Sequence, residues 1–342
     1  MKEKVLVTGG TGYIGSHTII YLIETGYDVI CVDNGINSDK SVLNVVEKIT
    51  GVRVPYFHID LCDLERTESI FKEHSEIHGI IHFAALKSVS DSVSNPIIYF
   101  RNNLVSLINI LELSVKYNVG AFIFSSSCTV YGDVTHSPVD EDTPLKETAS
   151  PYGRTKQIGE QIVSDVLKQS NTKSILLRYF NPAGAHPSGL LGESPINSPQ
   201  NLVPVITETA IGRRQKMIVY GTDYPTRDGS CIRDYIHVCD LARAHTKALN
   251  YIFEGKQDKP GDIFNIGIGN GLSVLEIIRA FEKVSGLKLN YEKGERRPGD
   301  IMAIFSDYKK AKEQLDWFPE YNVDDIMNTA WIWEQNRSSQ IL

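Results

Sequence analysis

Short apolar runs alternate with longer stretches of helical periodicity through the first 180 residues of the chain. Six runs have the continuous apolar character of buried strands, at residues 5–8, 28–33, 54–59, 80–84, 121–125 and 174–179. Helices fit between them, among them 14–24, 97–117 and 152–168. Parallel strands are covered on both faces and are joined by helical crossovers. The pattern therefore predicts an α/β fold built on a Rossmann-type, doubly wound parallel sheet.

The alternation ends near Asn181. Residues 181–200 are rich in Pro, Gly, Ser and Asn and predict a long irregular loop, which in compact enzymes usually serves a site. Beyond the loop, short strands at 217–221 and 263–268 are mixed with helices at 272–284 and 308–314. We expect residues 1–180 to form the first domain, rejoined by about 235–250, and residues 181–342 to form a smaller mixed α/β lobe that binds substrate.

Composition narrows the class of protein. The 342 residues carry 35 basic and 42 acidic side chains, for a net charge of −7, which argues against a general nucleic-acid-binding protein. The five cysteines are odd in number and contain no Cys-x-x-Cys pair, so we expect neither a disulfide framework nor a metal site. The sequence shows no signal-peptide core and no membrane-spanning run, and a cytoplasmic protein is expected.

A glycine-rich turn follows the first strand and leads into a helix. Gly9, Gly12 and Gly15 have the spacing G-x-x-G-x-x-G. Glycine allows the tight turn, the close approach of backbone to a pyrophosphate, and the packing of helix on strand. The phosphate then meets the free N–H groups of the helix, so this turn predicts a dinucleotide site. The glycines at 267–271 have a different spacing and precede Ser273, a good helix cap, so we interpret them as structural.

Asp33 ends the second strand, 18 residues after Gly15. A carboxylate at this place can accept hydrogen bonds from both ribose hydroxyls of an adenosine and repels a 2′-phosphate. Since no arginine follows closely, NAD is favoured over NADP as the cofactor. Asp60 and Leu61, after the third strand, are weaker candidates for the adenine edge.

The candidate reacting centre is a Tyr-x-x-x-Lys pair. Tyr152 and Lys156 share one face of a helix that begins at Pro151, and Ser127 lies after the fifth strand, at the cofactor edge of the sheet. A free phenol has a pKa near 10, so it serves as a base near pH 7 only when a neighbouring ammonium stabilises the phenolate. Tyr308 and Lys312 match the same spacing but lack a preceding strand and serine, and we expect Lys312 to be a solvated helix residue.

These motifs together make the family recognisable. The chain resembles the extended short-chain dehydrogenase/reductases and, within them, the UDP-glucose 4-epimerases (UDP-galactose 4-epimerases). The resemblance covers nearly the whole chain and rests on residues 7–17, 82–87, 125–132, 152–156, 177–186, 201–204 and 228–238. The segments Ala-Gly-Ala-His (183–186) and Arg-Asp-Tyr-Ile-His-Val (233–238) point to the epimerases.

The resemblance implies a reversible epimerisation of UDP-galactose and UDP-glucose at C4. In that reaction Tyr152 takes the 4-hydroxyl proton, hydride passes to tightly bound NAD, the 4-keto sugar turns over, and hydride returns. The cofactor-binding residues implied, with those already named, are Gly9, Gly12, Tyr13, Ile14, Gly15, Asp33, Asn34, Asn37, Asp60, Leu61, Phe83, Ala84, Ala85, Lys87, Asn102, Ser125, Tyr152, Lys156 and Tyr179. The substrate-binding residues implied are Lys87, Ser127, Tyr152, Tyr179, Phe180, Asn181, Asn201, Leu202, Ile218, Tyr220, Arg233, Arg297, Asp300 and Ile304.

Two positions depart from the family pattern. Cys128 stands where the family often has Ala, and Ile304 replaces the Tyr of hexose-restricted members or the small residue of members that accept N-acetylated sugars. We therefore hypothesise some activity on UDP-GalNAc and UDP-GlcNAc. A UDP-uronate 4-epimerase and an NAD-sensing regulatory protein remain as alternatives. A nucleotide-sugar 4,6-dehydratase is disfavoured, because Cys128 and Thr129 replace the Asp-Glu pair that elimination of water requires.

The two long helices at 97–117 and 152–168 carry apolar residues on more than one face. Such helices are buried against a partner as well as against their own sheet. In the family these helices pair two subunits, so a homodimer is expected.

Overall fold

A seven-stranded parallel sheet forms the centre of the computed structural model, which describes residues 3–196, 198–297 and 300–339. Its strand order is β11-β6-β5-β4-β1-β2-β3, and every neighbouring pair is parallel. The strands are β1 (Lys4–Thr8), β2 (Asp28–Asp33), β3 (Tyr56–His58), β4 (Ile77–His82), β5 (Ala121–Ser127), β6 (Lys173–Tyr179) and β11 (Gly261–Ile266). The predicted Rossmann-type, doubly wound sheet is confirmed.

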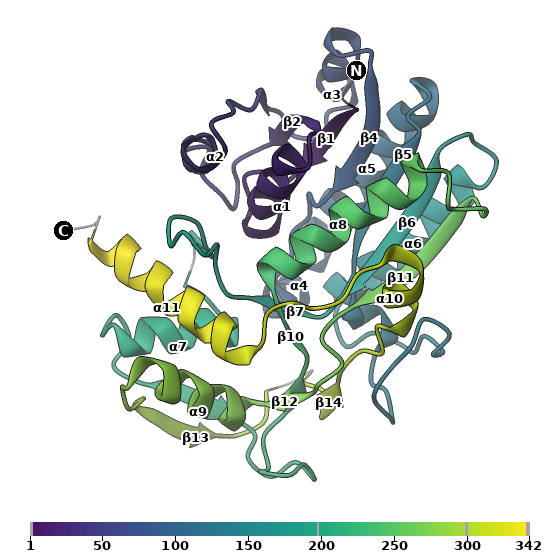
Figure 1. Cartoon of the computed structure of the whole chain (residues 1–342). Coiled ribbons are helices and arrows are strands. Elements are labelled where there is room, and N and C mark those ends of the chain that lie inside the picture. Colours follow the sequence, from purple (N-terminus) through teal and green to yellow (C-terminus); the bar gives the residue numbers. More distant parts are fainter. Residues whose placement is uncertain (1–2, 197, 298–299, 340–342) are drawn as a thin grey trace.

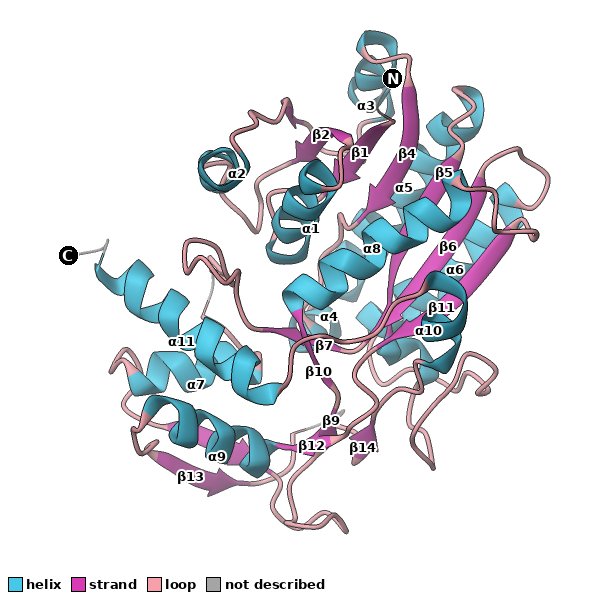
Figure 2. Cartoon of the chain, viewed as in Figure 1, coloured by secondary structure: helices cyan, strands magenta, loops and turns pink. Residues whose placement is uncertain are grey.

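Helices cover both faces of this sheet (Figures 1 and 2). One face packs against α1 (Tyr13–Glu24), α2 (Val42–Thr50), α8 (Val238–Phe253) and α10 (Lys309–Leu315). The opposite face packs against α3 (Leu64–Glu73), α5 (Pro96–Lys116) and α6 (Pro151–Leu167). Successive strand residues alternate between the two apolar layers, as the two-residue repeat of a strand requires. Ile123 of β5, for example, belongs to the first layer, whereas Phe122 and Phe124 belong to the second.

One strand was assigned to the wrong part of the molecule. The sequence placed 263–268 in the smaller lobe, but β11 pairs with β6 along its whole length, from Gly261 opposite Ser174 to Ile266 opposite Tyr179. Its helix α10 packs against the same face as α8. The chain therefore returns to the main sheet near residue 261 as well as through α8. An edge strand that comes from far along the sequence has no local signal of its partner.

The remaining elements lie below the sheet in Figure 1 and enclose a third apolar cluster. This cluster joins α7 (Leu202–Ala210), α9 (Val274–Ser285), α11 (Val323–Ser339) and β8 (Met217–Tyr220). Ser273 caps α9 in a reciprocal capping box with Glu276, as the sequence predicted. Short strands complete this part: β7 (Asn181–Ala183), β9 (Ile232–Arg233), β10 (Tyr235–His237), β12 (Leu272–Ser273), β13 (Tyr291–Gly294) and β14 (Ala303–Ile304).

A fourth, small cluster lies beside the end of β5. It contains residues of η1 (Cys128–Tyr131), together with Phe180 and Ile304. The short helix α4 (Val89–Ser94) packs against α5 and α6 nearby. The carboxyl ends of β1, β4, β5 and β6, which we call the carboxyl edge, thus face the elements that follow residue 181.

Candidate active site

The glycine turn after β1 forms a cradle that no larger residue could form. Gly9 has a φ of +67°, and a Cβ atom there would lie 2.8 Å from the backbone nitrogen of Ala84. A Cβ on Gly15 would overlap the Gly9 carbonyl oxygen. Gly12 caps α1 without any side-chain hydrogen bond from the described residues, so the N–H groups of Tyr13 and Ile14 open the helix uncapped. This arrangement fits a pyrophosphate at the helix N-terminus.

Asp33 lies at the end of β2, beside this turn. Its two carboxylate oxygens accept hydrogen bonds from the backbone N–H groups of Gly35 (2.9 Å) and Thr11 (3.2 Å). Each oxygen retains a further lone pair, which is what two vicinal ribose hydroxyls require. Asp60 accepts instead from the Cys62 N–H and is exposed, whereas Leu61 is buried. These two acceptor oxygens therefore fit the ribose of the adenosine half of a dinucleotide.

Further predicted cofactor residues line the carboxyl edge between β4 and α5. Phe83, Ala84, Ala85 and Asn102 are all partly buried. The Phe83 ring packs 4.6 Å from the imidazole of His245, measured between ring centroids. Asn34 is partly buried and Asn37 is exposed in the loop after β2. The structure thus brings the predicted cofactor residues to one edge of the sheet.

Three consecutive serines end β5, and each has a different partner. The Ser125 hydroxyl shares a hydrogen bond with the phenol of Tyr179, which lies on β6. The Ser126 hydroxyl donates to Glu160 of α6 at 2.5 Å. Ser127 accepts from the Thr129 N–H and faces the Tyr152 phenol. The alternation of side chains along a strand separates Ser125 from Ser126 across the sheet.

Tyr152 and Lys156 are held one turn apart at the start of α6. Ser150 caps the helix by accepting from the Gly153 N–H, and Pro151 occupies its first turn, so the sequence itself sets where the helix begins. The Lys156 ammonium donates to the Ser125 carbonyl at 2.6 Å and lies 6.0 Å from the centre of the Tyr152 ring. The predicted triad of Tyr152, Lys156 and Ser127 is therefore assembled in space.

Burial sets the protonation of this pair. It raises the pKa of Tyr152 well above its usual value, and a hydrogen bond with Ser127 acts in the opposite direction. Burial lowers the pKa of Lys156 to about 8, while the nearby Glu160 carboxylate raises it. The phenol can become a base only when further positive charge is brought next to it. A cationic cofactor ring at the carboxyl edge would supply such a charge.

The second Tyr-x-x-x-Lys pair is structural. Tyr308 packs edge-on against the buried Trp317 at 6.0 Å, and Lys312 is exposed on α10. Spacing alone therefore does not distinguish the two pairs, and only the Tyr152 pair lies beside a strand that ends in serines.

Two arginines and two aromatic or aliphatic side chains gather where the nucleotide was predicted to bind. Arg297 forms an ion pair with Asp300 at 3.0 Å and lies over the Tyr220 ring at 4.9 Å. Arg233 lies 3.7 Å from the same Asp300. Ile218 and Tyr220, both 37% exposed, point to one side of β8. This cluster offers cations for a diphosphate and a flat apolar wall for a base.

Asn181 and Asn201 complete the polar lining. The Asn181 side-chain oxygen is buried and has no hydrogen-bond partner among the described residues, which is typical of a group that awaits a ligand. Asn201 caps α7 and Leu202 begins that helix. Phe180 and Tyr179 are buried at the end of β6.

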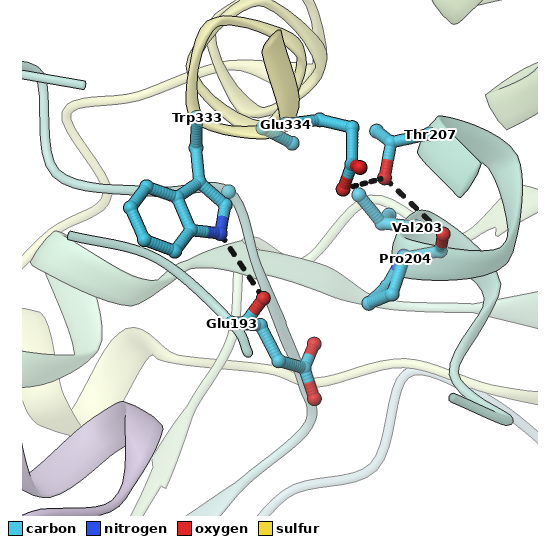
Figure 3. A pocket seen from close by; sticks show the side chains of 8 residues that line it. Glu193, Val203, Pro204, Thr207, Trp333 and Glu334 are labelled. Atoms are coloured by element: carbon cyan, nitrogen blue, oxygen red, sulfur yellow. Dashed lines mark hydrogen bonds between the residues drawn. The ribbon is translucent and has the colours of Figure 1, made fainter. Parts of the chain in front are cut away.

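Glu193 contacts two of the predicted substrate residues, although no sequence motif marks it. Its Oε1 atom accepts from the Lys87 ammonium (3.4 Å) and from the Asn201 amide (3.0 Å). The Trp333 indole donates to its backbone carbonyl at 3.1 Å (Figure 3). Glu193 thus connects two predicted substrate residues across the chain. The available signal was that it is the one acidic residue within 181–200.

Ile304 and Cys128 lie together beside Ser127. Both belong to the small apolar cluster with Phe180, and Ile304 is only 2% exposed. Burial raises the pKa of the Cys128 thiol to about 12, so it behaves as an apolar side chain. Thr129 follows it in η1, where a dehydratase would need a carboxylate.

Neither a metal cluster nor a membrane helix stands out in the described ranges. No group of three or more His, Cys, Asp or Glu side chains is placed to hold an ion there. Likewise, none of the helices among residues 3–196, 198–297 and 300–339 has the length and apolar character needed to cross a bilayer.

Comparison with known proteins places this geometry in a family. Residues 6–330 match a family model described as GDP-mannose 4,6 dehydratase. The chain is 46% identical over 333 residues to the UDP-glucose 4-epimerase of Bacillus subtilis, with 97% of each chain covered.

Two crystal structures agree over nearly the whole length. One is UDP-glucose 4-epimerase from Bifidobacterium longum in complex with NAD+ and UDP, at TM-score 0.94 and 45% identity, covering 98% of this chain and 99% of that chain. The other is UDP-glucose-4-epimerase from Stenotrophomonas maltophila with bound NAD and formylated UDP-arabinopyranose, at TM-score 0.95 and 40% identity, covering 99% of each chain. This chain belongs to the UDP-glucose 4-epimerase family, within the extended short-chain dehydrogenase/reductases.

Proposed function

We propose that the protein interconverts UDP-galactose and UDP-glucose at C4 with tightly bound NAD. The observation that carries this proposal is the arrangement of Tyr152, Lys156 and Ser127 at the carboxyl edge, beside the glycine cradle. It is supported by the relatives, since the Bifidobacterium longum enzyme is described with NAD+ and UDP. The uncapped N-terminus of α1 and the Asp33 carboxylate are the groups that would hold the dinucleotide.

The protein's own residues then manage the proton. When bound, NAD supplies the acceptor, and later the donor, of the hydride at C4. Tyr152 takes the proton of the sugar 4-hydroxyl, with Ser127 bridging the two oxygens. The Lys156 ammonium stabilises the phenolate from one helix turn away. After the 4-keto sugar turns about its bond to the diphosphate, Tyr152 returns the proton on the other side.

The nucleotide end must be held firmly while the sugar turns. Arg233 and Arg297 are suited to the diphosphate, because a guanidinium forms two parallel hydrogen bonds to phosphate oxygens. Asp300 would accept from the uridine ribose, and Tyr220 and Ile218 would flank the uracil. Asn181, with its unpaired buried oxygen, and Asn201 would complete the polar contacts.

We also propose a division of labour along the chain and a dimeric assembly. Residues 1–180, joined again by 235–250, would bind NAD, and residues 181–342 would bind the nucleotide sugar, although β11 belongs to the main sheet. The helices expected to pair two subunits, α5 and α6, both carry exposed apolar side chains, and the neighbouring α4 adds two more. These residues are Ile97, Ile98, Ile108, Val115, Val166, Val89 and Val93, and they are suited to burial against a second copy.

The sugar specificity follows from Ile304. Its side chain packs beside Cys128 and Phe180 and lacks the aromatic ring of hexose-restricted relatives, so we propose partial activity on UDP-GalNAc and UDP-GlcNAc. The test uses protein purified without added NAD and incubated separately with UDP-galactose, UDP-GalNAc and UDP-glucuronate. Formation of UDP-glucose would support both the reaction and the retained cofactor. Exclusive turnover of UDP-glucuronate would contradict the proposal.

A further inference from the structure

A third member extends the Tyr152–Lys156 pair along α6. Glu160 lies four residues beyond Lys156, so the three side chains share one face of the helix. Each meets a different residue at the end of β5. Tyr152 faces Ser127, Lys156 donates to the Ser125 carbonyl, and Glu160 accepts from the Ser126 hydroxyl at 2.5 Å. The proposed reacting pair is thus followed, one turn further into the protein, by a buried carboxylate.

An arginine holds that carboxylate with two hydrogen bonds. Arg178 donates from Nε to one Glu160 oxygen (2.9 Å) and from Nη2 to the other (2.7 Å). Arg178 lies on β6 directly opposite Ser126 of β5. The two side chains are 4% and 7% exposed. The third guanidinium nitrogen, Nη1, donates to the Tyr131 hydroxyl at 3.2 Å. That hydroxyl in turn donates to the Asn265 side-chain oxygen. Three hydrogen bonds, two from Arg178 and one from Ser126, therefore hold the carboxylate in place, and it cannot turn away.

A buried ion pair is a costly way to hold a sheet together. Apolar residues of similar volume often stabilise a protein as well or better, so such a pair is weak evidence for a purely structural role. Here the pair lies immediately behind an ammonium that is itself buried. Burial lowers the pKa of Lys156, and the Glu160 carboxylate opposes that effect. A lysine that must stay charged in a dry site needs such a neighbour.

Other groups around the pair do not supply that charge. His82 of β4 faces Lys156, and burial lowers its pKa to about 3, so it is neutral. Tyr99 of α5, Cys128 of η1 and Tyr179 of β6 face Tyr152, and burial raises the pKa of each to about 12. Asp91 of α4 bonds with Tyr99 rather than with Lys156.

We propose that Glu160 is a positioning residue for Lys156, which keeps the ammonium charged and directed at the end of β5. The hydrogen bonds from Arg178 and Ser126 hold the Glu160 carboxylate in the position that this role requires. The effect of Glu160 on catalysis rests on the proposed function, whereas its effect on the charge of Lys156 does not.

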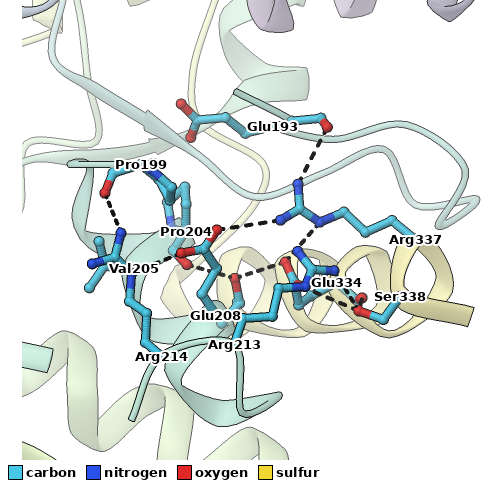
Figure 4. A network of polar contacts seen from close by, with 12 residues as sticks. Glu193, Pro199, Pro204, Val205, Glu208, Arg213, Arg214, Glu334, Arg337 and Ser338 are labelled. Atoms are coloured by element: carbon cyan, nitrogen blue, oxygen red, sulfur yellow. Dashed lines mark hydrogen bonds and ion pairs between the residues drawn. The ribbon is translucent and has the colours of Figure 1, made fainter. Parts of the chain in front are cut away.

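A matched control exists on α11, where Glu334 is 3% exposed and pairs with Arg213 (2.9 Å) and Arg337 (3.1 Å) (Figure 4). Glu334 also accepts a hydrogen bond from Thr207.

The test compares Glu160→Gln with Glu334→Gln. The first measurement is kcat for UDP-galactose from pH 6 to 10. In Glu160→Gln the alkaline decline should move to lower pH by about one unit, with KM within about twofold, because Lys156 loses its proton earlier. Glu334→Gln should lower thermal stability and leave the profile superimposable on that of the unmodified protein. An unmoved profile in Glu160→Gln, or an equal shift in both variants, would overturn the proposal.

A second measurement is independent of turnover. Protein labelled with [ε-13C]lysine reports the titration of Lys156, whose signal is assigned by its disappearance in Lys156→Arg. The midpoint should fall in Glu160→Gln and stay in Glu334→Gln. If Glu160→Gln does not fold, Ser126→Ala removes one bond to the carboxylate and should move the midpoint in the same direction. An unmodified protein without epimerase activity would refute the proposed function, while an unchanged midpoint would refute the role of Glu160.

Discussion

The Nζ atom of Lys156 lies 2.6 Å from the main-chain carbonyl oxygen of Ser125, and this hydrogen bond ties α6 to the end of β5. The ammonium lies 6.0 Å from the centre of the Tyr152 ring, so it acts on the phenol through a longer-range electrostatic interaction. The contact fixes the lysine before any substrate arrives. The candidate reacting centre is therefore preorganised.

Removing the Tyr152 hydroxyl should abolish most of the activity. Tyr152→Phe keeps the ring packing of a side chain that is 8% exposed but removes the group that transfers the proton. We expect kcat for UDP-galactose to fall at least about 100-fold. Tyr308→Phe is the matched control, because Tyr308 has the same spacing to a lysine and no strand or serine before it. Similar losses in both variants would contradict our assignment of the reacting pair.

Asp33 should control retention of the cofactor. Asp33→Asn weakens a charged acceptor at the end of β2, and we expect NAD affinity to fall about tenfold or more. The measurement is the NAD released on denaturation after gel filtration. Asp39→Asn, in the exposed loop after β2, should retain the cofactor like the unmodified protein. Equal retention in all three proteins would show that Asp33 does not contact the ribose.

Glu193 should act on substrate binding more than on chemistry. Glu193→Ala removes the acceptor shared by Lys87 and Asn201 and leaves both side chains less well placed. We expect KM for UDP-galactose to rise about threefold to tenfold with kcat little changed, as when an interaction common to bound states is lost. Glu292→Ala, which breaks the exposed pair with Lys216, is the control. A fall in kcat without a change in KM would contradict this reading.

Four buried histidines should make the fold sensitive to mild acid. Burial lowers the pKa of His17, His82 and His237 to about 3 and that of His245 to about 4. Unfolding exposes them with a pKa of about 6.5, so the unfolded chain binds more protons. Their contribution to stability is complete above about pH 6.5 and declines as the pH falls toward 3 to 4.

The measurement is the urea midpoint between pH 7.5 and 5.0, which should fall steadily. Asp240 opposes the trend in part, because burial raises its pKa to about 6 and its protonation on acidification favours the folded state. His17→Gln, at a side chain with no exposure, should flatten the pH dependence at some cost in stability at pH 7.5. A midpoint that stays constant down to pH 5.5 would disprove the prediction.

The apolar face of α4 and α5 should carry the subunit contact. Light scattering of the unmodified protein should give twice the mass of one chain. Ile97→Glu places a charge on a side chain that is 69% exposed in the single chain, and we expect a shift to monomer. Leu287→Glu, at an exposed residue after α9, should leave the mass unchanged. A monomeric unmodified protein would rule out this interface.

The sheet was predictable because its signals are local. Each buried strand is a continuous apolar run followed by a helix. The glycine turn can be identified from residues 9–15 alone. β11 was misplaced because its partner β6 lies more than 80 residues earlier, and an edge strand carries no mark of that distance. Strand boundaries also differed slightly, as at β3, where Pro55 leaves only Tyr56–His58 in the ladder.

The site was predictable where a motif concentrates chemistry in one segment. Tyr152 and Lys156 lie one helix turn apart in the sequence, whereas Glu193 meets Lys87, 106 residues earlier, only in space. Glu160 was missed for a related reason. In the sequence its partner Arg178 is a single charged residue within an apolar strand. Only the pairing of β5 with β6 shows that Arg178 lies beside Ser126 and contacts Glu160.

In the sequence, the three serines at the end of β5 form a short repeat whose members appear interchangeable. Because each hydroxyl or carbonyl in that run is committed to a different partner, the repeat has no redundancy. Inserting or deleting one residue in β5 would keep the composition of the run and exchange every assignment at once. A substitution in this run therefore changes one contact, whereas a slip in length changes all of them together.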